Sequence, residues 1–167
     1  MKLQKVYPSL PSGHSIFCDD IRQEISGKRT IIGIYATHLF VPHIPCTLPM
    51  LSIYITFRDE ISSPSDVIFR VFFERFEGDQ SIESQTRALE NDMRDSEKIF
   101  EVTVPTPPES VKKKPKEFIM REGKFDLQIA PFNVTSRGKL KVRAYRDNLE
   151  VLLGTLIVDI KPAVDGD

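Results

Sequence analysis

Apolar and polar side chains alternate one by one in several separate stretches of this 167-residue chain. The clearest stretch is residues 51–58, where Leu51, Ile53, Ile55 and Phe57 are separated by Ser52, Tyr54, Thr56 and Arg58. Because successive side chains of a β-strand point to opposite faces of the sheet, this pattern predicts a strand with one buried face. The alternation recurs in residues 99–104, 124–129, 139–145 and 156–160. Several such strands require sheets that cover one another's apolar faces.

Turn-forming residues separate the predicted strands. Ser26-Gly27-Lys28 stands between the β-prone runs 15–18 and 30–35, and glycine takes a positive φ without a Cβ penalty, so these residues predict a hairpin. Asp147-Asn148 predicts a second, tight hairpin. Gly33 interrupts a strand pattern, which indicates a bulge or a close backbone approach.

Other segments carry weaker patterns. Residues 67–76 are apolar on both faces, which indicates a covered central strand or a contact surface, and together with residues 51–58 we expect them to form a β-meander. Residues 37–49 contain three prolines and predict a crossing loop. Residues 81–98 are polar and charged, and predict either a solvated helix or an irregular excursion. In residues 99–104 we expect Phe100, Val102 and Val104 to face inward, and in residues 156–160 the apolar face is Leu156, Val158 and Ile160.

These patterns predict an all-β fold, mainly antiparallel: a two-sheet β-sandwich of about seven to eight strands, with at most one short helix in residues 81–98. The length suits one domain, which we place at residues 15–162, after an extended N-terminal segment (1–14) and before a C-terminal tail (163–167). Regular alternation of strands and helices is absent, which argues against a parallel α/β sheet.

Composition narrows the classes of partner. Lysine and arginine number 23 against 24 acidic residues, and a net charge of -1 gives no global attraction to nucleic acid or anionic membranes. No apolar run approaches the ~20 residues that span a bilayer, and the first residues lack the apolar core of an export signal. We therefore expect a soluble, cytoplasmic protein in which Cys18 and Cys46 are free thiols.

The candidates for a metal site are weak, and we expect no cofactor. They are Asp19, Asp20, His38, His43 and Cys46. Adjacent strand residues point to opposite faces, which separates the two carboxylates, and the spacing of the histidines and Cys46 is not one of the usual zinc-finger patterns. The favoured roles are structural: a turn at the end of the first strand with a salt bridge to Arg22 or Lys28, two loop histidines and a buried thiol.

Two basic groups are candidate binding residues. The first is Lys112, Lys113, Lys114 and Lys116, which lack a neighbouring arginine or aromatic residue and favour a solvated loop. The second is Lys139, Lys141, Arg143 and Tyr145, on one side of a predicted strand whose other side is Leu140, Val142 and Ala144. This stripe is expected to be exposed, where it meets an acidic partner or a second copy, or deters edge pairing. Replacing Lys141 and Arg143 with glutamate is then expected to leave the fold intact.

The first third of the chain contains five distinctive runs: Phe17-Cys18-Asp19-Asp20-Ile21-Arg22, Gly27-Lys28, Ile32-Gly33-Ile34-Tyr35, Val41-Pro42 and Leu48-Pro49. Together these runs resemble a family of uncharacterised small proteins from bacteria and phages. The resemblance implies a compact, mostly antiparallel β domain and brings no assigned catalytic residue. A phosphate-binding glycine-rich loop and a nucleophile elbow are both absent.

Three function classes follow. The favoured one is a non-enzymatic module that binds another protein or a second copy, as an accessory protein of phage or bacterial host-defence biology. The first alternative is nucleic-acid binding through the lysine loop and the basic strand face. The second alternative is a small metal-dependent hydrolase built on the five weak metal candidates.

Overall fold

The computed structural model describes residues 10–60, 65–76, 96–105 and 120–162. These residues form eleven strands and no helix, so none of their elements is a helix long and apolar enough to cross a membrane. The strands are β1 (Ser12–Gln23), β2 (Arg29–Tyr35), β3 (His38–Val41), β4 (Cys46–Leu48), β5 (Leu51–Glu60), β6 (Val67–Arg75), β7 (Ser96–Val104), β8 (Met120–Ile129), β9 (Phe132–Val134), β10 (Gly138–Arg146) and β11 (Leu149–Ile160).

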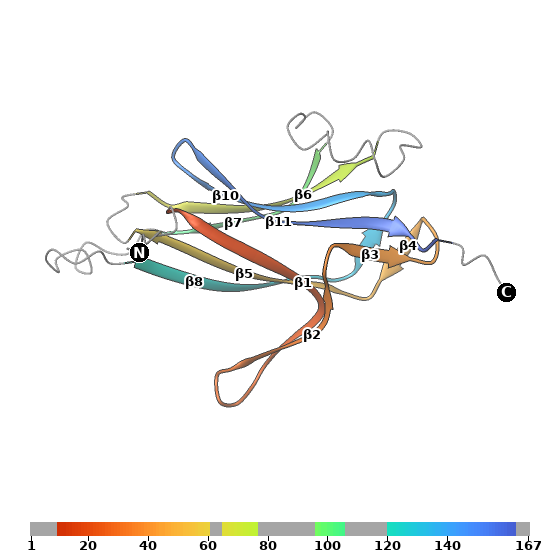
Figure 1. Ribbon diagram of the computed structural model, residues 1–167, viewed down its shortest axis with the longest axis horizontal. Helices are drawn as coiled ribbons and strands as arrows, with labels where there is room; N and C mark the ends of the chain where they lie inside the picture. Colours follow the sequence, from red (N-terminus) through yellow and green to blue (C-terminus); the bar gives the residue numbers. More distant parts are fainter. Residues whose placement is uncertain (1–9, 61–64, 77–95, 106–119, 163–167) are drawn as a thin grey trace, which may run out of the picture.

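Two sheets lie face to face and confirm the predicted sandwich (Figure 1). One sheet has the strand order β2-β1-β5-β8 and the other has the order β3-β11-β10-β6-β7. All neighbours in both sheets are antiparallel except β3 and β11, which run parallel. Strands β4 and β9 form a short third sheet.

The core lies between the two sheets, where the alternation placed it. Leu51, Ile53, Ile55 and Phe57 of β5 are buried, as are Leu140, Val142 and Ala144 of β10. Phe57 meets Phe69 of β6 edge to face, with 5.3 Å between the ring centroids. Such aromatic contacts add to the free energy of apolar burial, so this pair helps to hold one sheet on the other.

The expected crossing loop at residues 37–49 is wrong, because this segment contains β3 and β4. Pro42 and Pro45 lie between these two strands and Pro49 follows the second, so no proline interrupts a ladder. These short strands, together with β9, raise the strand count above the expected seven or eight.

The expected meander is also wrong. Strands β5 and β6 belong to different sheets, so the chain passes from one sheet to the other between Glu60 and Val67. Strand β6 is nonetheless central, because it pairs with β10 on one side and β7 on the other. Its apolar residues on both faces correctly indicated a covered strand.

Two apolar residues predicted to face inward are exposed. Val102 lies on β7, an edge strand with a register shift against β6, and it is 38% exposed although Phe100 and Val104 pack against the core. Ile160, the last residue of β11, is 41% exposed. Both sit at a border of the five-stranded sheet, where the opposite sheet covers less.

The ends of the predicted domain and the polar excursion are partly described. Strand β1 begins at Ser12, inside the segment expected to precede the domain. Residues 96–98 of the excursion belong to β7, and the helix or loop expected over residues 81–95 lies outside the described residues.

Candidate functional site

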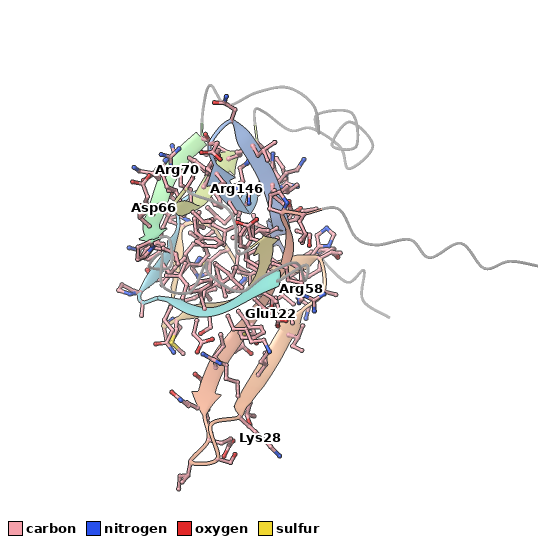
Figure 2. All side chains as sticks on the ribbon, turned by 90° about the vertical axis from the view of Figure 1, so that its left-hand side faces the viewer. Lys28, Arg58, Asp66, Arg70, Glu122 and Arg146 are labelled. Carbon is pink, nitrogen blue, oxygen red and sulfur yellow. The ribbon has the colours of Figure 1, made fainter. Side chains whose placement is uncertain are left out.

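A hairpin projects from the four-stranded sheet (Figure 1). Strand β1 pairs with β5 from Ser12 to Cys18, and it pairs with β2 from Phe17 to Gln23. Beyond Cys18, β1 therefore has β2 as its only partner strand among the described residues. We call residues 19–35 the hairpin arm, with its base at Asp19 and Tyr35 and its tip near Lys28, which Figure 2 shows at the far end.

The tip of the arm is a tight three-residue connection. The Gly27 amide donates to the Glu24 carbonyl at 2.9 Å, and the Glu24 amide donates to the Lys28 carbonyl at 2.8 Å. Gly27 has φ +79°, the left-handed conformation that such a turn places before the second strand. The hairpin predicted from residues 26–28 is confirmed.

The base of the arm is braced by Asp19, Gly33 and Tyr35. The Tyr35 hydroxyl donates to the Asp19 carboxylate, and burial, followed by this hydrogen bond, raises the pKa of Tyr35. Gly33 has φ +67°, and a Cβ on it would lie 1.8 Å from Oδ2 of Asp19. Gly33 thus makes the close approach that its position in the strand indicated, and it leaves room for the carboxylate.

A contact of Arg29 ties the arm to the sandwich. Nε of Arg29 donates to Oδ2 of Asp126 on β8 at 2.6 Å, and its guanidinium lies 5.8 Å from the ring centroid of Tyr54 on β5. The charged contact and the stacked cation both fix the start of β2. The arm is therefore braced within itself at its base and tied to the sandwich at Arg29.

Three isoleucines of the arm face solvent. Ile25 at the tip is fully exposed, at 109% of its reference area, while Ile34 is 62% and Ile32 is 38% exposed. Ile32 and Ile34 are two residues apart on β2 and so share one face. The exposure of these residues was not predicted from the sequence. A signal for it was present in Thr30–Tyr35, because Ile31 and Ile32 are adjacent and point to opposite faces of a strand, so one core cannot bury both.

Asp19 and Asp20 were expected at the end of the first strand. This expectation is wrong, because β1 continues to Gln23. The register continues through them because β2 supplies partners as far as Gln23. Asp20 pairs with Arg22 at 2.8 Å, which confirms one of the two expected ion-pair partners.

The remaining metal candidates do not converge. Within the described residues no group of three or more His, Cys, Asp and Glu side chains is placed to hold a metal ion. His38 stacks on Phe40 with 5.3 Å between ring centroids, and Nδ1 of His43 lies 2.9 Å from the Pro45 carbonyl. Cys46 is a free thiol on β4. These arrangements are those of structural side chains.

Cys18 is also a free thiol, and it is fully buried. Its Sγ donates to the Ser52 carbonyl at 3.6 Å. Burial, and after it the negative charges of Asp19 and Asp20, raise the pKa of Cys18 to about 11. A thiol of this kind is a poor nucleophile at neutral pH.

The prediction that the cationic stripe on β10 is exposed is wrong. Lys139 and Lys141 are only 8% and 6% exposed. Nζ of Lys141 lies 2.5 Å from the carboxylate of Glu74, and Arg143 approaches the same carboxylate at 3.6 Å and pairs also with Glu150. The acidic partners come from β6 and β11, so the sequence of β10 by itself could not reveal them.

The other two members of the stripe region also have neighbours. Burial, and after it the nearby charge of Lys141, lowers the pKa of Lys139, whose Nζ lies 5.6 Å from the ring centroid of Phe76. The guanidinium of Arg70 lies over the Tyr145 ring, with 4.8 Å between its Cζ atom and the ring centroid. The stripe is a largely covered part of the fold, in which Lys141 and Arg143 have acidic partners. The second basic group, Lys112 to Lys116, lies outside the described residues.

A buried ion pair between the two sheets was not predicted from the sequence. Asp59 on β5 is completely buried and pairs with Arg146 on β10, whose side chain is 13% exposed. A signal was present, because Asp59 continues the inward row of Leu51, Ile53, Ile55 and Phe57. A carboxylate in an apolar row predicts a buried partner of opposite charge.

Comparison with known proteins gives a family and no function. No curated protein and no solved structure is significantly similar to the chain. A family model matches residues 14–151, which include the hairpin arm and nine of the strands in full. The match covers well over half of the chain, and the chain therefore belongs to DUF6941, a family of unknown function.

Proposed function

We propose that the protein is a non-enzymatic interaction module that binds another protein through the hairpin arm. The observation that carries this proposal is the exposure of Ile25, Ile32 and Ile34 on an element that projects from the sandwich and is braced at its base. Exposed apolar groups on a monomer's surface lose contact with water when a partner covers them, which favours binding.

The bracing supports the same proposal. A flexible hairpin loses conformational freedom when it binds, and this loss opposes association. The Asp19–Tyr35 and Arg29–Asp126 contacts hold the arm before any partner arrives. The entropic cost of binding a partner is then smaller than for a flexible hairpin.

A non-catalytic role fits the arrangement of the candidate chemical groups. In the part of the chain that the structure describes, the histidines, cysteines and carboxylates do not gather at a common point. Lys139 and Lys141 are covered, and Lys141 is paired with Glu74, so the described residues add no support to nucleic-acid binding.

The biological setting belongs to the proposal as well. A cytoplasmic location fits two free thiols, because reducing compartments keep cysteines reduced. An accessory role in bacteria or phages follows from the resemblance of the Phe17–Arg22 run and its companion motifs.

Site-specific crosslinking tests the proposal. A photo-activated amino acid replaces Ile25 at the tip of the arm, and in a control it replaces Leu149, which is 49% exposed at the start of β11. After illumination in cells of the native host, we expect discrete protein adducts from position 25 and none of the same mass from position 149. Adducts that are equal at both positions, or no protein adduct at position 25, contradict the proposal.

A further inference from the structure

Strand β2 presents an unprotected sheet edge. One side of β2 pairs with β1, and within the described residues no strand pairs with the other side. Natural edge strands are commonly blunted by lysine, proline or inward charges. From Thr30 to Tyr35, β2 has none of these three, and its solvent face carries Ile32 and Ile34. A β-bulge can also blunt an edge, and the one irregularity of β2 is Gly33, at φ +67°. The edge is therefore open to another strand.

We propose that a second copy of this chain occupies the edge, with the two β2 strands antiparallel about a two-fold axis that passes beside Ile32. This inference rests on the proposed function and names the partner. Cyclic two-fold dimers are the commonest protein assemblies, and their interfaces place each residue on the axis opposite itself.

The hydrogen bonds of the hairpin fix which backbone groups are free. The Glu24 amide donates to the Lys28 carbonyl, so this pair is hydrogen-bonded, and such pairs alternate along an antiparallel ladder. Thr30, Ile32 and Ile34 then direct their amides and carbonyls toward β1. The groups of Arg29, Ile31, Gly33 and Tyr35 point to the open side.

This alternation agrees with an axis at Ile32. Ile32 is the middle residue of Arg29–Tyr35, so the two copies of β2 pair over their full length only with Ile32 opposite itself. Ile31 then faces Gly33 of the second copy, and both direct backbone groups to the open side. Ile32 occupies a non-hydrogen-bonded pair, in which the side chains approach most closely. Gly33, at φ +67°, departs from the extended conformation, so the contact depends most on the Ile32 pair.

The charges of β2 do not oppose a second copy. Arg29 is the one charged residue of β2, and with the axis at Ile32 it lies opposite Tyr35 of the other copy. Like charges therefore do not face each other between the two copies of β2, and the guanidinium of Arg29 keeps its partner Asp126 in its own chain.

The apolar faces also match. With the axis at Ile32, Ile34 of one copy lies opposite Thr30 of the other, so the exposed row Thr30, Ile32 and Ile34 meets only uncharged side chains. Apolar cross-strand pairs stabilise a sheet, whereas like charges directly opposite destabilise it. A charge placed at position 32 therefore tests whether the two apolar rows meet.

The test uses two variants with opposite charges. Ile32→Glu and Ile32→Arg each place like charges on the axis, so we expect each variant to be monomeric in analytical ultracentrifugation at a concentration where the unchanged chain is a dimer. The dimer dissociation constant should rise at least ~10-fold, which corresponds to ~1.4 kcal/mol. Mixing the two variants should restore a one-to-one heterodimer, detected by native mass spectrometry. Ile160→Arg, at a 41% exposed position of the other sheet, is the matched control and should remain dimeric.

Several results overturn the inference: a monomeric unchanged chain at ~100 μM, single variants that still dimerise, or a mixture that stays monomeric. If circular dichroism shows that a charged variant is unfolded, Ile32→Cys replaces it. Residues on the axis in a non-hydrogen-bonded pair lie close enough for a disulfide, so air oxidation should link two copies through position 32, while Ile160→Cys should not. Failure of this link also overturns the inference. A monomer that crosslinks other proteins at position 25 refutes the second copy alone, and a chain that crosslinks none refutes the proposed function too.

Discussion

Lys141→Glu should destabilise the sandwich strongly, although the lysine lies on the outer face of its sheet. Its side chain is 8% exposed and that of Glu74 is 18% exposed, and the two charges are 2.5 Å apart. Removing one partner of a buried ion pair costs about 3–5 kcal/mol, and the partial exposure of Glu74 places the expected loss near ~3 kcal/mol. For a domain of this size that loss lowers Tm by roughly 6–12 °C.

Urea titration followed by circular dichroism measures the change in the free energy of unfolding. Lys124→Glu is the matched control, because Lys124 pairs with Glu122 at 3.2 Å but is 51% exposed, and exposed pairs contribute about 0–1 kcal/mol. Adding Glu74→Lys to Lys141→Glu restores opposite charges and should recover much of the loss. A loss for Lys141→Glu no larger than that of the control refutes the reasoning. The same geometry reverses the expectation that glutamate at both Lys141 and Arg143 leaves the fold intact.

Three other changes test the core, the arm and the thiols. Val142→Asp buries a charge at a position with 0% exposure and should cost several kcal/mol in the same urea titration; a loss under ~1 kcal/mol contradicts the assigned inner face of β10. Gly33→Ala should accelerate hydrogen exchange in residues 19–35 and leave the exchange rates of β10 unchanged, because the added Cβ displaces the Asp19 carboxylate. Equal exchange rates of residues 19–35 in this variant and in the unchanged chain argue against the brace. At pH 8, well below the Cys18 pKa of about 11, iodoacetamide without reductant should leave Cys18 unmodified in the folded chain and add two labels in urea; labels that appear only after reduction contradict the free thiols.

The inner face of the central strands could be predicted from the sequence, because it depends on the side-chain period of a single strand. The apolar residues of β5 and β10 are buried as their alternation indicated. Ser52, Thr56 and Lys141, on the opposite faces of these strands, are buried as well, which the alternation did not indicate. The neighbours of each strand could not be predicted in the same way. Strand β5 pairs with β1 and β8, from distant parts of the sequence, and the sheet partners of a strand depend on packing among all strands.

The candidate site shows the same division. The hairpin itself was predictable from Gly27 and its flanking β-prone runs. Its projection depends on where β5 begins, since Cys18 pairs with Ser52 and β5 starts at Leu51, directly after Pro49 and Met50. The burial of Lys141 likewise depends on Glu74, a residue of a different strand. Both features require the register between strands, which no single-strand pattern contains.

The parallel pair of β3 and β11 has a consequence for the order in which the chain can fold. His38 pairs with Ile157, so one border of the five-stranded sheet cannot close until nearly all of the described chain has left the ribosome. Contacts between such distant residues slow folding, because a long loop must be ordered before the contact is gained. Leu39 and Val41 are buried in the folded protein, but during synthesis they lack their partner strand β11. Apolar surface and strand edges that are exposed in this interval can aggregate, which is the hazard that chaperones limit.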